Sequence, residues 1–117
     1  MKKLLLSVLG ALALAPTAQA GCWATVKLSS MPSARVWNVN VTPLQHGRTM
    51  LPDAKPRIEV RTRAGAWRSF AARPTSTPGV FRARVVFPAA GTWRFRVWDG
   101  FEPTCARYHT YPAVTLK

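Results

Sequence analysis

Residues 80–98, VFRARVVFPAAGTWRFRVW, consist of two runs in which apolar side chains recur at every second position. This alternation has the two-residue period of a strand that buries one face and exposes the other. The intervening Pro-Ala-Ala-Gly, residues 88–91, has the composition of a tight turn. The stretch therefore predicts an antiparallel hairpin with one apolar and one basic face. The basic positions between the apolar ones are Arg82, Arg84, Arg94 and Arg96.

The same alternation continues along the chain from residue 22, and proline or glycine interrupts it about every eight to twelve residues. No part of this region has the 3.6-residue period of a long helix. We therefore predict an all-β fold, a seven-stranded antiparallel immunoglobulin-like sandwich over residues 21–117, with a small closed barrel as the alternative. The expected strands are 23–28, 35–41, 57–63, 67–72, 80–87, 92–98 and 108–116. The tryptophans expected in the core are Trp23, Trp37, Trp67 and Trp93.

The beginning of the chain has the three parts of a secretory signal peptide. Two lysines precede an apolar stretch that is too short to span a membrane, and residues 18–20, Ala-Gln-Ala, have the small-x-small pattern of a cleavage site. We expect cleavage after Ala20, so that residues 1–20 are the signal peptide and the mature protein is exported to the periplasm or the extracellular space. Cys22, beside the cleavage point, leaves a lipid-anchored form as the alternative.

Two cysteines remain in the mature chain, Cys22 at its start and Cys105 near its end. Exported proteins enter an oxidising compartment, where paired cysteines form disulfides. We expect a bridge between Cys22 and Cys105, which in the chain-entropy description stabilises the fold by about 4–5 kcal/mol. Two metal-binding thiolates are the alternative, although neither cysteine has a CxxC partner or a histidine at ligand spacing.

The charge of the chain is strongly positive, with 17 Lys and Arg against 4 Asp and Glu, a formal net charge of +13. If the third and sixth expected strands pair, five arginines and Trp98 share one exposed sheet face. Such a face attracts anionic polymers of the cell envelope or an acidic envelope protein, without requiring nucleic acid as the dedicated partner. A solvated surface with no partner is the alternative. The arginines of this expected face are Arg57, Arg61, Arg63, Arg94 and Arg96.

The residues available for catalysis are few, since the chain has 2 His and 4 acidic residues. It contains no nucleophile elbow, Walker loop, dinucleotide fingerprint or HExxH. Asp99 and Glu102 lie close together in a glycine-containing loop, but we interpret them as part of a solvated turn. An enzyme would require His46 or His109 to lie beside one of the carboxylates in a cleft. We therefore predict no enzymatic activity and no catalytic residue.

A copper site is the alternative to a cofactor-free protein. His46 and Met50 lie in the one long connection that we expect, residues 42–56, and long loops carry function more often than short ones. With Met31 and His109 they offer the thioether and imidazole groups that Cu(I) favours. Three of them also have ordinary interpretations: His46 as a loop residue, Met50 as a cover over the edge of the sandwich and His109 as a strand residue.

Three segments of the chain carry a resemblance to a family: residues 52–56, PDAKP; 74–83, PTSTPGVFRA; and 87–93, FPAAGTW. Here Gly79-Val80-Phe81 and Gly91-Thr92-Trp93 resemble the glycine-aromatic starts of strands in the immunoglobulin-like envelope domains called YtkA-like or FixH-like. The similarity covers roughly residues 36–98. It implies an immunoglobulin-like fold, and some members of the family are associated with copper handling or oxidase assembly.

Together these observations predict an exported, non-enzymatic β-sandwich that acts as a small binding or accessory module of the cell envelope. The alternative is a periplasmic copper-handling protein.

Overall fold

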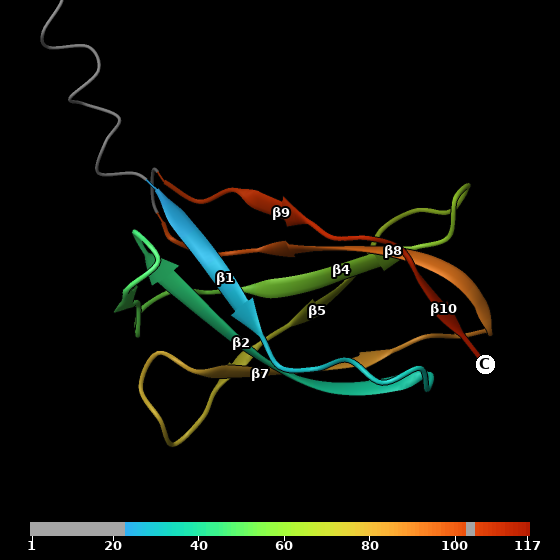
Figure 1. The fold of residues 1–117 in the computed structure, drawn as a ribbon, viewed down its shortest axis with the longest axis horizontal. Coiled ribbons are helices and arrows are strands. Elements are labelled where there is room, and N and C mark those ends of the chain that lie inside the picture. Colours follow the sequence, from blue (N-terminus) through green and yellow to red (C-terminus); the bar gives the residue numbers. More distant parts are fainter. Residues whose placement is uncertain (1–22, 103–104) are drawn as a thin grey trace, which may run out of the picture.

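A computed structural model describes residues 23–102 and 105–117 of the chain. This part contains strands and no helix, in two five-stranded antiparallel sheets that form the two layers seen in Figure 1. The all-β prediction is confirmed for the described residues. The strands are β1 (Ala24–Leu28), β2 (Val36–Gln45), β3 (Thr49–Met50), β4 (Arg57–Arg61), β5 (Arg68–Ala71), β6 (Arg73–Pro74), β7 (Phe81–Val86), β8 (Gly91–Trp98), β9 (Tyr108–Thr110) and β10 (Val114–Leu116).

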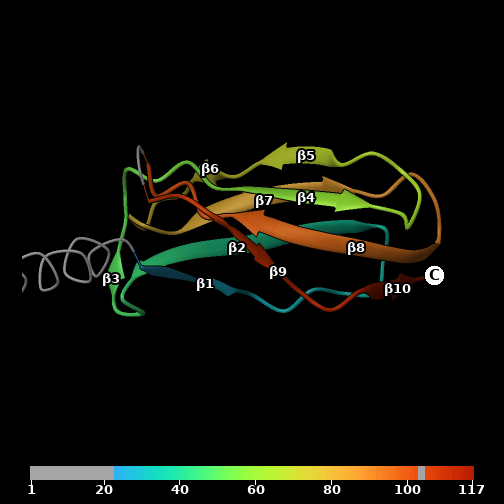
Figure 2. The ribbon, with the colours of Figure 1, turned by 90° about the horizontal axis from the view of Figure 1, so that it is seen from above.

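The strand order differs between the two sheets. The first sheet has the order β1-β2-β7-β6, with β3 also paired to β2, and the second has the order β10-β8-β4-β5, with β9 also paired to β8. Figure 2 shows the strands of both sheets from a direction in which this order can be followed. The pairing of β4 with β8 is the one that the sequence analysis required for a shared basic face.

The core lies between the sheets and is formed by alternate residues of the strands. In β7 and β8 the buried positions are the apolar ones of the quoted stretch, while the arginines between them lie on the outer faces. Trp37 is fully buried and packs edge-on against Phe87 and Phe95, with ring centroids 4.6 and 5.4 Å apart. Burying several large side chains of this kind contributes about 1.5–3 kcal/mol for each one.

The second strand is longer than predicted, because β2 continues through Pro43 to Gln45. The backbone N–H of Ser29 donates to the Asn40 carbonyl, and the backbone N–H of His46 donates to the Trp23 carbonyl. The even-numbered residues of β2 therefore direct their backbone N–H and C=O groups toward β1. Pro43 therefore turns its nitrogen to the opposite side, between the end of the pairing with β7 and the start of the pairing with β3. Proline is accepted in a strand where no ladder bond is required of it.

The connection predicted over residues 42–56 consequently starts with a hairpin and not with a loop. His46 and Gly47 have φ angles of 52° and 72°, and Arg48 donates its backbone N–H to the Gln45 carbonyl. Two consecutive residues with positive φ are typical of the type I′ turn that joins twisted strands. The long loop therefore shortens to the segment between Met50 and Arg57.

Two of the four tryptophans expected in the core are not there. Trp37 and Trp93 are buried, but Trp23 is 48% exposed, and Trp67 is partly exposed and contacts arginines of an outer sheet face. Both precede a strand instead of lying within one. Alternation assigns a side chain to a face only inside a strand, so it carried no information at these positions.

The expected strand 108–116 is also two strands, β9 and β10, which pair with different parts of β8. Pro112 lies between them and has no backbone N–H for a ladder.

Candidate functional site

The outer face of the second sheet carries most of the predicted basic residues. The β4–β8 register places Arg57 opposite Trp98 and Arg61 opposite Arg94. Arg96 lies between them, opposite Glu59. The structure thus brings together four of the five predicted arginines, and Trp98 is beside them as expected. Arg63 lies beyond the end of β4 and is exposed.

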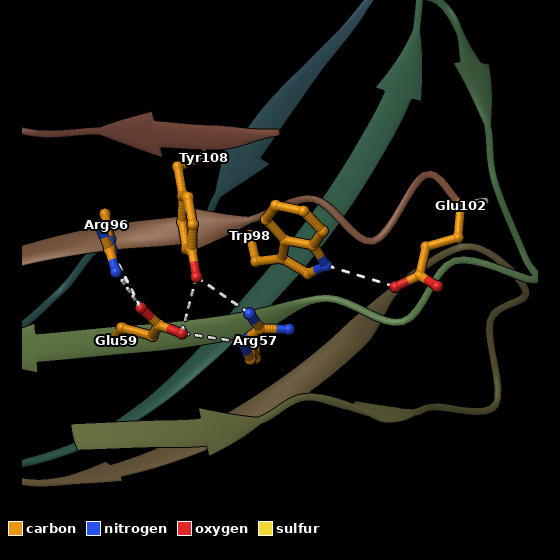
Figure 3. A network of polar contacts seen from close by, with 6 residues as sticks. All are labelled: Arg57, Glu59, Arg96, Trp98, Glu102 and Tyr108. Carbon is orange, nitrogen blue, oxygen red and sulfur yellow. Dashed lines mark hydrogen bonds and ion pairs between the residues drawn. The ribbon is translucent and has the colours of Figure 1, made fainter. Parts of the chain in front are cut away.

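Glu59 is at the centre of this face and is only 6% exposed. Its carboxylate accepts hydrogen bonds from Arg57 Nε at 2.8 Å, from Arg96 Nε at 2.9 Å and from the Tyr108 hydroxyl at 3.2 Å. Figure 3 shows the two guanidinium groups and the phenol converging on it. Burial of the only acidic residue of the face is therefore compensated by three donors.

These contacts shift the acidity of the groups involved. Burial by itself raises the pKa of Glu59, but the hydrogen bonds from Arg57 and Arg96 outweigh burial, so that the pKa lies below its ordinary value. The hydrogen bond to Glu59 raises the pKa of Arg57 above its already high value. Glu59 is therefore a carboxylate at neutral pH and holds its two arginines in place.

Aromatic rings fill the spaces between the guanidinium groups. The Arg96 guanidinium carbon lies 4.0 Å from the Trp67 ring centroid and 3.8 Å from that of Tyr108, so Arg96 lies between two rings. Trp67 is also 4.5 Å from Arg61, and Trp98 is 5.0 Å from Arg57. Such contacts contribute about 0.5–2 kcal/mol each. We call this set the arginine–aromatic ladder: Arg61, Trp67, Arg96, Tyr108, Arg57 and Trp98.

One end of the ladder has excess positive charge. Arg61 and Arg94 lie directly opposite each other on neighbouring strands, and among the described residues neither forms an ion pair with a carboxylate. Arg61 Nε is buried and has no hydrogen-bond partner there. Like charges in this position destabilise a sheet, and an unpaired buried donor adds to that cost. An anion bound to the two guanidinium groups would relieve the repulsion between them.

The sequence analysis missed three members of this site. Glu59 is not among the predicted site residues, and Trp67 is one of the tryptophans expected in the core. Tyr108 was noted only as the start of a strand. The register between β4 and β8 could have indicated Glu59, since it places the carboxylate opposite Arg96. No local signal places Trp67 and Tyr108 there, because they reach the face from a loop and from β9.

Of the two acidic residues expected in a solvated turn, Glu102 is exposed in a turn, but Asp99 is not solvated. Asp99 is fully buried, accepts hydrogen bonds from the backbone N–H groups of Phe101 and Arg107, and lies 2.8 Å from His109 Nε2. That prediction was wrong because the loop after β8 folds back over this carboxylate. His109 thus meets the contact condition for an enzyme, although neither residue of the pair lines any of five surface cavities in the described part of the chain. Here Asp99 organises the loop.

The four candidate copper ligands lie in different surroundings. His46 is at the tip of the β2–β3 hairpin, 5.7 Å from the Trp23 ring, and Met50 is in β3 of the same hairpin. Met31 packs against the core, and His109 contacts Asp99. Among residues 23–102 and 105–117 there is no cluster of three or more His, Cys, Asp or Glu side chains that could hold a metal ion. Copper binding by the His and Met set stays a prediction.

The remaining predictions fall partly outside the described residues. Cys105 lies in the loop between β8 and β9, but Cys22 and the predicted signal peptide are not among the described residues. The disulfide and the cleavage therefore stay predictions. In the part of the chain that the structure covers, no helix has the length and apolar character needed to cross a membrane.

Comparisons of the chain with family models, with curated proteins and with solved structures give no match. A function is therefore inferred from the geometry of the site.

Proposed function

We propose that the protein is an exported, non-enzymatic module that binds an anionic polymer of the cell envelope. The observation that carries this proposal is the pair Arg61 and Arg94, which face each other without a carboxylate between them. Arg61 packs on Trp67, and Glu59 holds Arg57 and Arg96 in the rest of the ladder, so these side chains are ordered before a ligand arrives. Order of this kind lowers the entropic cost of binding.

The chemistry of arginine favours the same class of ligand. A guanidinium group forms paired hydrogen bonds with a carboxylate or a phosphate. The chain has 17 basic and 4 acidic residues, so its overall field adds attraction to any polyanion. Two guanidinium groups on adjacent strands fit two successive anionic groups, or two oxygens of one group.

We propose further that the two sheets form an immunoglobulin-like sandwich, as the resemblance to YtkA-like domains implies. The order of the first sheet, β1-β2-β7-β6, corresponds to strands A, B, E and D of that fold, and β5-β4-β8 followed by β9 and β10 corresponds to C′, C, F and G. Domains of this architecture bind many kinds of ligand, so the function is argued from the site alone.

Binding at the ladder is tested by retention on a heparin matrix. We expect the double variant Arg61→Gln, Arg94→Gln to bind a heparin oligosaccharide about tenfold more weakly than the unchanged protein, because two charge-assisted contacts are lost. The control is Lys27→Gln, Arg48→Gln, two exposed cations away from the ladder, which removes the same charge. Equal weakening by both variants would show that only net charge matters and would contradict a site.

The predicted bridge between Cys22 and Cys105 is tested by peptide mapping of the exported protein without reductant. We expect one linked peptide that contains both cysteines, and a lower midpoint of denaturant unfolding after reduction. Alkylation of both thiols before reduction, or a lipid mass on Cys22, would contradict the bridge.

A further inference from the structure

The first sheet has a basic groove of its own, which shares no residue with the ladder. It lies where β6 and β7 pass the edge strand β5 of the other sheet, and its volume is about 660 Å³. Three arginines line it: Arg73 from β6, and Arg82 and Arg84 from β7. All three are exposed, and none of the four acidic residues of the chain lines the groove.

Two of these arginines repeat the arrangement found beside the ladder. Arg73 is directly opposite Arg82 in the β6–β7 register, and Arg84 follows Arg82 on the same face. Among the described residues none of the three forms an ion pair. Arg82 Nε donates a hydrogen bond of 3.0 Å to the Asn40 side chain, which fixes its direction without neutralising its charge. Like charges directly opposite each other cost stability, and a bound anion removes that cost.

The arginines of the groove differ from those of the ladder in their partners. There, Glu59 accepts hydrogen bonds from Arg57 and Arg96, and rings cover both guanidinium groups. In the groove no carboxylate of the described residues pairs with the guanidinium groups, and the bond of Arg82 Nε to Asn40 leaves the other N–H groups of Arg82 for a ligand. Three guanidinium groups in one concave surface can donate more hydrogen bonds to an anionic chain than the same groups could on a flat surface.

One wall of the groove is rigid. The Thr75 hydroxyl donates to the Val80 carbonyl at 2.8 Å and accepts the Thr77 N–H at 3.2 Å, and the Thr75 backbone N–H bonds to the same Val80 carbonyl. These bonds close the loop between β6 and β7. Ser76 on this loop and Asn38 on β2 add neutral polar groups to the lining. The groove therefore combines three arginines with a hydroxyl and an amide beside a loop closed by hydrogen bonds.

The lining of the groove favours one class of polyanion over another, acidic sugar chains over nucleic acids. The one aromatic residue of the lining, Phe70, is partly buried and packs against the core, so no open ring is available for a nucleobase to stack on. Sugar rings need no stacking platform if their hydroxyl groups meet polar side chains and their acidic groups meet arginine. The lining therefore suits an acidic sugar chain better than a nucleic acid.

We propose that this groove is a second binding site, which takes a segment of a sugar chain that carries carboxylate or phosphate groups. Arg73 and Arg84 bind the acidic groups, and Asn38 and Ser76 meet the sugar hydroxyls. The site is separate from the ladder, because its arginines lie on the first sheet and it shares no residue with the ladder. One molecule then holds two anionic segments at once.

The experiment is a titration of isotope-labelled protein followed by amide chemical shifts. The ligands are a hexamer of galacturonic acid, a phosphorylated mannopentaose, neutral maltohexaose and a six-nucleotide single-stranded DNA. We expect the two acidic sugars to shift amides of β6, β7 and residues 75–80, and the neutral sugar to bind at least tenfold more weakly. The acidic sugar that binds more tightly identifies carboxylate or phosphate as the group recognised.

Variants separate this site from the ladder. The double variant Arg73→Gln, Arg84→Gln should bind the acidic sugars at the groove at least about tenfold more weakly. The double variant Arg61→Gln, Arg94→Gln should keep the affinity measured from the groove amides within about twofold of that of the unchanged protein. Both groove positions are exposed, and an unchanged unfolding midpoint would verify that the groove variant folds. The proposal is overturned if the affinity measured from amides of β6, β7 and residues 75–80 is the same in the groove variant as in the unchanged protein. It is also overturned if shifts occur only on β4 and β8, or if the DNA binds more tightly than both sugars. Failure of heparin binding at the ladder alone would leave the groove result unaffected.

Discussion

Replacing Gly100 by alanine should lower the free energy of unfolding by at least about 3 kcal/mol, the sum of overpacking and backbone strain. Gly100 has a φ of +68°, and a Cβ atom on it would overlap backbone atoms of Lys55. The Gly100 carbonyl also accepts the backbone N–H of Lys55 at 3.2 Å, so the two segments are held together and neither moves away easily. Urea unfolding followed by tryptophan fluorescence measures the loss.

Gly91 provides the control for this variant. Its φ is +119°, but a Cβ atom there would meet no heavy atom within 4 Å. Gly91→Ala therefore carries the backbone strain without the overlap, and should lose only about 1–3 kcal/mol. Equal losses in the two variants would contradict the close approach of Gly100 to Lys55.

Glu59→Gln should cost about 2 kcal/mol of stability, the range for hydrogen bonds to charged groups. The amide keeps the shape of the side chain but offers one acceptor atom in place of two. Its NH₂ group then faces the donors of Arg57 or Arg96, which lose their compensating charge. Thermal and denaturant unfolding at neutral pH measure the difference. Glu102→Gln is the control, since Glu102 is exposed and meets the Trp98 indole only at 3.5 Å.

The stability of Glu59→Gln should also depend on pH differently from that of the unchanged protein. The pKa of Glu59 is lower in the folded protein than its ordinary value of 4.5, so the folded state holds this proton less tightly than the unfolded state does. The contribution of the ionised Glu59 to the free energy of unfolding is complete above pH 4.5, and it is lost as the pH falls through the lowered folded-state pKa. Glu59→Gln should therefore show a shallower loss of stability in acid than the unchanged protein. Parallel acid limbs would contradict the role given to this carboxylate.

The sequence predicted the strands of the core correctly where alternation was long. In β7 and β8, six or more residues keep the two-residue period, so the buried and exposed sides followed directly from the positions of Phe, Val, Trp and Arg. The period also placed Arg57, Arg61, Arg94 and Arg96 on one face once β4 and β8 were assumed to pair. It did not predict the continuation of β2 through Pro43, because proline usually ends a strand that has neighbours on both sides.

The sequence by itself determined which side chains of each long strand enter the core, because that choice depends only on the alternation of neighbouring residues. Only the tertiary structure decided what meets on the outer surface. Glu59 receives Arg57 and Arg96, Trp67 covers Arg96, and Asp99 reaches His109. Each of these contacts depends on the register between strands or on the path of a loop. Those are set by packing between residues far apart in the chain, which a local pattern does not encode.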